Sequence, residues 1–174
     1  NINGNCNRGS HCTVSSWNHN GYHSNVGVLD MQTKKFKAMQ AISQSMGENN
    51  DCSVKAVAMF CNVRYTVAHA ALAVVGRKKG KGSTPDRIKT VVDSIMGKKH
   101  EYLYPLDARQ KSLGWTNSLG CDAKTPTTFA RKSPVKGGQL VIVNGHIIYM
   151  KDGVIHDHDS CNKRRIVMVM NHVG

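Results

Sequence analysis

This chain has few aromatic side chains, no long apolar run and no apolar segment at its start. Aromatic residues make up only 6% of its 174 residues, so a core must be built mainly from Val, Ile, Leu, Met and Ala. No run of about 18 apolar residues occurs, which argues against a membrane-spanning helix. The first residues also lack the apolar segment of a secretory signal peptide, so we expect no export by that route.

Acidic residues are scarce relative to basic ones. The chain has 11 Asp and Glu against 24 Lys and Arg, a formal net charge of +13 and a pI near 9.7. This balance favours acidic partners, nucleic acid among them. A glycine-spaced basic segment supplies the candidate nucleic-acid contacts, which are Arg77, Lys78, Lys79 and Lys81. The segment lacks the spacing of a phosphate-binding P-loop, and a solvated loop is the alternative interpretation.

Dense cysteine spacing is also absent, because the six cysteines are spread over the whole chain. We therefore expect free thiols rather than a disulfide scaffold. Two groups of residues have the ligand types of a zinc site: Cys6, His11, Cys12, His19 and His23, and then His156, Asp157, His158, Asp159 and Cys161. The first group lacks the CxxC pair of common zinc sites, and the second is better explained as part of a hairpin that acts with Cys52, so we predict no metal and no cofactor.

The order of apolar patterns predicts an α+β domain, with helices first and a small antiparallel sheet later. Residues 1–30 are rich in Asn, Gly, Ser and His and are interpreted as a loop-rich arm, and residues 31–174 as a single domain. Helices are predicted over residues 30–46, 52–61, 65–75, 85–97 and from 126. Strands are predicted over residues 101–104, 140–143, 146–151, 154–157 and 165–170, with Asp152-Gly153 as a type I′ turn.

Cys52 and His146 carry the strongest chemical signal. Cys52 follows a polar loop and stands in the first turn of a predicted helix, with Asp51 as the expected side-chain N-cap. The amides of a helix N-terminus and a neighbouring imidazolium both favour a thiolate, which is the reactive form of cysteine. His146 stands on the first strand of the predicted hairpin, where it can serve as the base if the hairpin packs against that helix.

A third group must hold the imidazole by accepting a hydrogen bond from its second ring nitrogen. In a hairpin that turns at Asp152-Gly153, Asp157 falls close to His146, so we predict that Asp157 fills this role. Asp159 and Asn144 remain alternatives. The oxyanion of the reaction needs fixed donors, for which we predict the backbone amide of Cys52 and the side chain of Asn50 or Asn49.

Four segments together resemble a family of small phage-encoded proteins with a papain-like cysteine peptidase fold of the bacteriocin-processing type. They are residues 50–58 (NDCSVKAVA), 65–69 (YTVAH), 76–82 (GRKKGKG) and 145–157 (GHIIYMKDGVIHD), and the resemblance covers roughly residues 45–160. It implies a papain-like fold with Cys52 as nucleophile, His146 as base and Asp157 as orienting acid. One departure is that Met46 stands where papain-like enzymes usually carry an oxyanion glutamine, and Gln44 lies two residues further back.

The leading hypothesis is therefore a cysteine-dependent hydrolase, a peptidase or isopeptidase that acts on a protein or peptide substrate through Cys52, His146 and Asp157. The alternative is a non-catalytic basic binding or virion structural protein that keeps the peptidase fold. A third hypothesis is a nucleic-acid-associated protein, whose binding would depend steeply on salt. The resemblance also implies other virion or phage proteins as partners, and the host cytoplasm or the virion as location.

Overall fold

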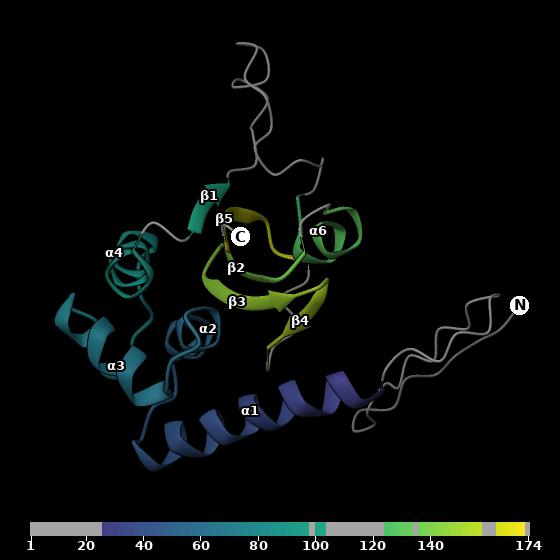
Figure 1. Cartoon of the computed structure of the whole chain (residues 1–174). Coiled ribbons are helices and arrows are strands. Elements are labelled where there is room, and N and C mark those ends of the chain that lie inside the picture. Colours follow the sequence, from purple (N-terminus) through teal and green to yellow (C-terminus); the bar gives the residue numbers. More distant parts are fainter. Residues whose placement is uncertain (1–25, 98–99, 104–123, 134–135, 158–162, 173–174) are drawn as a thin grey trace, which may run out of the picture.

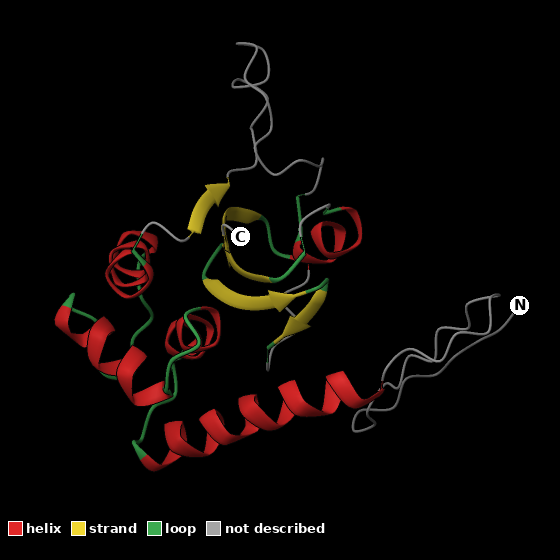
Figure 2. Ribbon diagram, in the orientation of Figure 1, coloured by secondary structure: helices red, strands yellow, loops and turns green. Residues whose placement is uncertain are grey.

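The structure is a computed structural model that describes residues 26–97, 100–103, 124–133, 136–157 and 163–172. One five-stranded antiparallel sheet has helices packed on both of its faces (Figures 1 and 2). The predicted α+β class, with most helices preceding the sheet, is confirmed in this form.

Ten elements make up the described residues. The helices are α1 (Val26–Ser45), α2 (Cys52–Phe60), α3 (Tyr65–Val74), α4 (Pro85–Met96) and α6 (Pro126–Lys132). The strands are β1 (His100–Leu103), β2 (Gly138–Val143), β3 (His146–Lys151), β4 (Val154–His156) and β5 (Ile166–His172). Their order in the sheet is β1-β5-β2-β3-β4, and every neighbouring pair is antiparallel.

Alternation along the central strands separates two apolar clusters. On one face, side chains of β2, β3 and β5 pack with α2, α3 and α4; the strand members are Leu140, Ile142, Ile147, Tyr149, Met168 and Met170. On the other face, the intervening side chains pack around Phe129 of α6; they are Val141, Val143, Ile148, Met150, Ile166 and Val169. Because both faces are covered, the central strands consist of almost uninterrupted apolar residues.

The start signals of two helices act as predicted. The side chain of Thr84 accepts a hydrogen bond from the Arg87 amide, and that of Thr125 accepts one from the Thr128 amide. Both helices carry proline in their first turn, where its missing N–H costs nothing. The hairpin turn is also confirmed, since Asp152 and Gly153 have φ angles of 50° and 80°, as a type I′ turn requires.

Two local predictions are wrong. The first helix begins at Val26 rather than at Asp30, so it includes the end of the segment assigned to the arm; residues 1–25 lie outside the described residues. Asp51 does precede α2, but its side chain makes no capping hydrogen bond. Its two carboxylate oxygens are instead bound by Lys55 and Tyr65, which are stronger donors than a backbone amide.

α2 is the central helix of the fold, because it packs against β2, β3, α3 and α4. All of its residues after Cys52 are buried. Among the described residues, no single helix is both long and apolar enough to cross a membrane; α2 and α3 reach that length only as a pair bent by 115°. The packing of α2 on β3 brings the start of the helix close to the start of that strand.

Candidate active site

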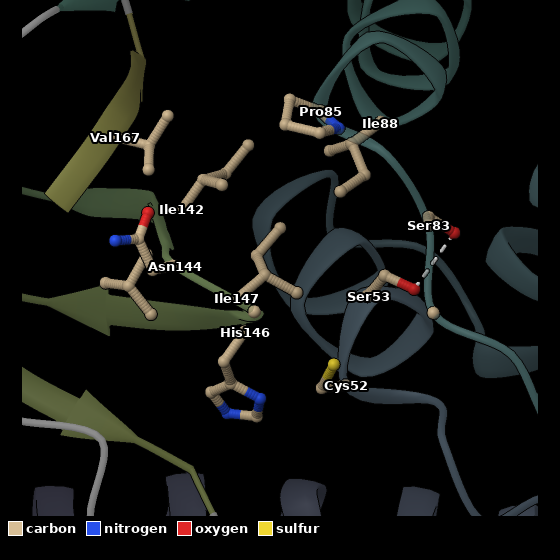
Figure 3. A pocket seen from close by; sticks show the side chains of 13 residues that line it. Cys52, Ser53, Ser83, Pro85, Ile88, Ile142, Asn144, His146, Ile147 and Val167 are labelled. Atoms are coloured by element: carbon tan, nitrogen blue, oxygen red, sulfur yellow. Dashed lines mark hydrogen bonds between the residues drawn. The ribbon is translucent and has the colours of Figure 1, made fainter. Parts of the chain in front are cut away.

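Cys52 and His146 meet at the edge between α2 and the sheet. Each is the first residue of its element, Cys52 of α2 and His146 of β3. Both line one cleft of about 280 Å³, and Figure 3 shows their side chains near each other at one end of it. The thiol is near enough to the imidazole to contribute to the raised pKa of His146. Cys52 is a free, partly exposed cysteine, so the sulfur can be reached from solvent.

Asp157 stands directly after β4 and holds the other side of the imidazole. His146 Nε2 lies 2.5 Å from Asp157 Oδ2, and the two side chains are only 8% and 5% exposed. Because Nε2 donates to the carboxylate, Nδ1 is the ring nitrogen left for the sulfur. The structure therefore brings His146 close to both Cys52 and Asp157, as the sequence predicts. Of the alternatives, Asp159 lies outside the described residues, and Asn144 lines the cleft.

The environment of His146 favours its charged form. The hydrogen bond to Asp157, and after it the interaction with Cys52, raise the pKa of His146 to about 9, against the opposing effect of burial. The imidazole is therefore protonated at neutral pH. A protonated imidazole beside a cysteine is the arrangement in which thiol hydrolases hold a thiolate–imidazolium pair.

A buried ion pair fixes the residue before the nucleophile. Lys55 Nζ lies 2.8 Å from Asp51 Oδ1, and both side chains are 3% exposed. The hydroxyl of Tyr65 donates to the second carboxylate oxygen at 2.7 Å, and Lys55 also donates to Gln40 of α1 at 2.5 Å. Burial opposes the charge of Asp51, but hydrogen bonds from Lys55, Ser43 and Tyr65 outweigh it and lower the pKa. These contacts join α1, α2 and α3 beneath the Cys52 loop.

A second buried ion pair joins the Cys52 loop to the glycine-spaced basic segment. Arg77 Nη1 and Nη2 bind the two oxygens of Glu48 at 3.1 and 3.0 Å, and the side chains are 1% and 0% exposed. The Gly80 amide and His69 Nε2 also contact this carboxylate, at 2.9 and 2.7 Å. The hydrogen bond from Arg77 is the main cause that lowers the pKa of Glu48 to about 2.

This pairing changes the interpretation of the basic segment. The sequence predicts Arg77 as a nucleic-acid contact together with three lysines, but its guanidinium is buried and bound by Glu48 and by the Asn50 carbonyl. Arg77 is therefore structural. Lys78, Lys79 and Lys81 remain exposed. Sequence reasoning missed the partnership because Glu48 and Arg77 lie 29 residues apart and share no local pattern.

A second, polar pocket of about 190 Å³ adjoins the reactive pair. Its lining includes Asn49, Asn50 and Arg164, together with Cys52 and His146. Both asparagines are exposed and line this pocket beside Cys52, which keeps both as candidates for the oxyanion donor. Met46, which stands at the position of the family's glutamine, packs against the core instead. The amide of Cys52 lies in the first helical turn, where amides lack an intrahelical partner.

Neither group of possible metal ligands forms a described site. The first group, in residues 1–25, and His158, Asp159 and Cys161 of the second all lie outside the described residues. His156 and Asp157 are described, but Asp157 binds His146, whereas the ring of His156 packs against Tyr149 with centroids 5.7 Å apart. Within the described part, no three His, Cys, Asp or Glu residues cluster as metal ligands would.

Comparisons of the chain with protein-family models, with curated proteins and with solved structures found no match. The site is therefore interpreted from its own geometry.

Proposed function

We propose that this protein is a papain-like thiol hydrolase, a peptidase or isopeptidase that cleaves an acyl bond in a protein or peptide. One observation carries the proposal: Cys52 at a helix start and His146 at a strand start line the same cleft, and Asp157 beyond the next turn is hydrogen-bonded to the imidazole. A nucleophile, a base and a group that orients the base are the three parts that this chemistry needs.

The steps follow from the positions of these atoms. Cys52 Sγ attacks the scissile carbonyl carbon, and the oxyanion that forms is held by the Cys52 amide and by Asn50 or Asn49. His146 then gives its Nδ1 proton to the leaving nitrogen, the C–N bond breaks and a thioester remains. Water attacks the thioester while His146 takes up a proton. The C–S bond then breaks, the acid product leaves, and the thiolate–imidazolium pair is restored.

The arrangement of layers supports a papain-like fold in particular. A buried helix presents the cysteine at its N-terminus, and an antiparallel sheet packed against that helix presents the histidine and the acid. The two buried ion pairs around Asp51 and Glu48 hold the loop that precedes the nucleophile. Fixed geometry of this kind reduces the reorganisation that each reaction step requires.

A second candidate is a non-catalytic basic binding or virion structural protein with the same fold. Two observations favour it: Met46 occupies the position of the usual oxyanion glutamine and packs into the core, and Lys78, Lys79 and Lys81 form an exposed basic segment. Such a protein would bind an acidic partner, nucleic acid or another virion protein, without using Cys52. The reactivity of Cys52 separates the two candidates.

Alkylation of Cys52 by iodoacetamide tests the proposal. In the wild type we expect labelling to continue at pH 5–6, as it does in thiol hydrolases whose cysteine stands beside an imidazolium. In His146→Ala we expect a rate at least about tenfold lower at that pH. The rates are read for each cysteine by mass spectrometry of peptides over pH 4–10. Cys61 is an internal reference, because burial raises its pKa to about 12 and makes it slow.

His172→Ala is the matched control for this experiment. His172 lies at the end of β5 and binds the Phe60 carbonyl, away from the cleft. Its replacement is expected to leave the Cys52 profile unchanged. If the wild-type profile rises only above pH 8, as for an ordinary thiol, and His146→Ala does not alter it, the hydrolase proposal fails and the binding or structural role stands.

A further inference from the structure

A separate pocket lies at the far end of the layer that α2 and β3 form. Cys52 and His146 begin these two elements, whereas Phe60 ends α2 and Lys151 ends β3. Phe60 and Lys151 both line a pocket of about 440 Å³, which we call the distal pocket. At about 1.5 Å of rise per residue, the nine-residue helix separates it from Cys52 by roughly 12 Å. The distal pocket shares no lining residue with the cleft, so the proposed hydrolysis does not account for it.

The space in the distal pocket depends on a glycine. Gly138 begins β2 and lines the pocket beside Tyr149 of β3. A Cβ on Gly138 would lie only 2.7 Å from the Tyr149 hydroxyl oxygen and 3.1 Å from the ring carbon Cε2. Tyr149 is 9% exposed, and within the described residues no hydrogen bond occupies its hydroxyl. Polar groups that are so far buried normally have a partner, so this hydroxyl is available to a ligand.

Two lysines bring positive charge to the distal pocket. Among the described residues, neither a hydrogen bond nor an ion pair occupies the Nζ of Lys151, which is half-buried. Lys35 of α1 donates to Asn62 Oδ1 at 3.0 Å, and both of these residues line the pocket. An ammonium group has three N–H donors, so Lys35 keeps two of them for a further acceptor.

Two carboxylates on neighbouring segments oppose this charge only in part. Burial, and after it the charge of Asp152, raises the pKa of Tyr149, so Asp152 is close; its carboxylate accepts a hydrogen bond from a backbone amide at 2.8 Å and does not line the pocket. Glu101 binds Asn171, its cross-strand partner. Because successive side chains alternate between the faces of a sheet, both lie on the face opposite to His172. The lining of the distal pocket is therefore positive.

The rest of the lining is apolar. Met59 and Phe60 of α2 are 6% and 1% exposed and contribute the helix side of the pocket. The ring of His172 packs against Phe60 with centroids 4.4 Å apart, and its Nε2 donates to the Phe60 carbonyl at 2.9 Å. This hydrogen bond satisfies a carbonyl at the C-terminus of the helix and holds the ring as a wall of the pocket.

We propose that the distal pocket binds a small molecule with an apolar body and one anionic end. The apolar body packs against the side chains at the end of α2. The anionic end accepts hydrogen bonds from Lys151, Lys35 and the Tyr149 hydroxyl, which are charge-assisted where a lysine donates. The volume of the pocket is within the usual range of small-molecule sites. The inference does not depend on the reactivity of Cys52.

Nuclear magnetic resonance of the whole ¹⁵N-labelled chain tests the site with simple probes. 2-Naphthoate has an apolar body and a carboxylate, 2-naphthamide is its neutral counterpart, and 2-naphthyl phosphate carries the other common anion. At pH 7 we expect 2-naphthoate to shift the amide signals of Phe60, Gly138 and Lys151, with a dissociation constant of about 1 mM, which suits a ligand of this size. 2-Naphthamide should bind at least about fivefold more weakly. The tighter of the two anions identifies the preferred group, and either supports the proposal.

Lys151→Gln is expected to weaken the binding of 2-naphthoate about three- to tenfold and to change that of 2-naphthamide less than about twofold. Lys132→Gln is the matched control, because it removes the same charge from an exposed position on α6, which packs on the other face of the sheet. Tyr149→Phe keeps the ring and removes the hydroxyl, so it should weaken 2-naphthoate more than 2-naphthamide. Gly138→Ala fills the space beside Tyr149 and should weaken both probes.

Several outcomes would overturn the inference. Equal binding of 2-naphthoate and 2-naphthamide would leave only an apolar crevice. Equal losses in Lys151→Gln and Lys132→Gln would indicate the general positive charge of the protein rather than a site. Shifts confined to the residues around Cys52 and His146 would place the probe in the cleft, and a whole chain without any shifted signal at millimolar 2-naphthoate would reject the distal pocket as a binding site.

Discussion

Asp157→Ala is expected to lower the turnover of p-nitrophenyl acetate at pH 7.5 by on the order of 10²- to 10⁴-fold while the protein stays folded. The carboxylate is 2.5 Å from His146 Nε2, so its removal frees the ring to rotate away from the sulfur. It also removes the main cause that raises the pKa of His146. Steady-state release of p-nitrophenolate measures the loss, and far-UV circular dichroism checks the fold.

The charge of His146 gives a second measurement that a merely structural Asp157 would not change. Iodoacetate is anionic and is attracted by an imidazolium, whereas iodoacetamide is neutral. In the wild type the rate with iodoacetate divided by the rate with iodoacetamide, both at Cys52, should fall as the pH rises through about 9. At that pH His146 loses its proton and no longer attracts the anionic reagent. In Asp157→Ala this fall should move to lower pH by at least about one unit. Burial lowers the pKa of His146, and the carboxylate that opposes this effect is absent from the variant.

Asp157→Asn is the conservative control for both measurements. The asparagine oxygen can still accept from Nε2–H, so orientation is kept while the negative charge is lost. We expect turnover between that of the wild type and that of Asp157→Ala, with the pKa of His146 lowered in both variants. Turnover in Asp157→Ala within about threefold of the wild type would contradict the assignment of Asp157 as the orienting residue.

Local sequence signals predicted those parts of the fold that local interactions determine. The proline-containing starts of α4 and α6 and the type I′ turn between β3 and β4 depend on residues within one turn of each other. The closeness of Asp157 to His146 followed from the same hairpin, because its tight turn fixes which residues face each other: Tyr149 pairs with His156.

The supports of the site could not be predicted in this way. Asp51 has the residue type of a helix cap, yet a lysine on its own helix and a tyrosine fourteen residues later bind its carboxylate. Arg77 has the neighbours of a solvated basic loop, yet Glu48 holds it in the interior. In both cases tertiary contacts offer a charged or hydroxyl partner that the local pattern does not contain, and a buried carboxylate takes the strongest donors available.

The second large expected effect is a loss of stability when the buried ion pair between Glu48 and Arg77 is broken. Glu48→Ala is expected to lower the free energy of unfolding by about 3–5 kcal/mol, because it leaves the guanidinium of Arg77 buried without its counter-charge. The Arg77 side chain is 1% exposed, and Glu48 also binds the Gly80 amide and His69. Urea denaturation followed by far-UV circular dichroism at pH 7 measures the change.

Glu101→Ala is the matched control, since it removes the same kind of side chain from an exposed position where Glu101 contacts only Asn171 among the hydrogen bonds described. We expect a loss below about 1 kcal/mol there. Acid gives an independent check. The folded pKa of Glu48 is about 2 against an ordinary 4.5, so its contribution is complete above pH 4.5 and is lost as the pH falls toward 2. The wild type should therefore lose stability over that range more steeply than Glu48→Ala.

A loss of less than about 1 kcal/mol in Glu48→Ala would show that Arg77 finds other partners. The geometry argues against this, because Arg77 Nη2 already binds the Asn50 carbonyl and Nε lies buried without a described partner. Removal of the carboxylate would therefore free both loops that it joins, the one before Cys52 and the one around Gly80. For that reason we expect the remaining folded Glu48→Ala protein to alkylate Cys52 with a weaker dependence on His146, which links the stability of this ion pair to the geometry of the proposed catalytic site.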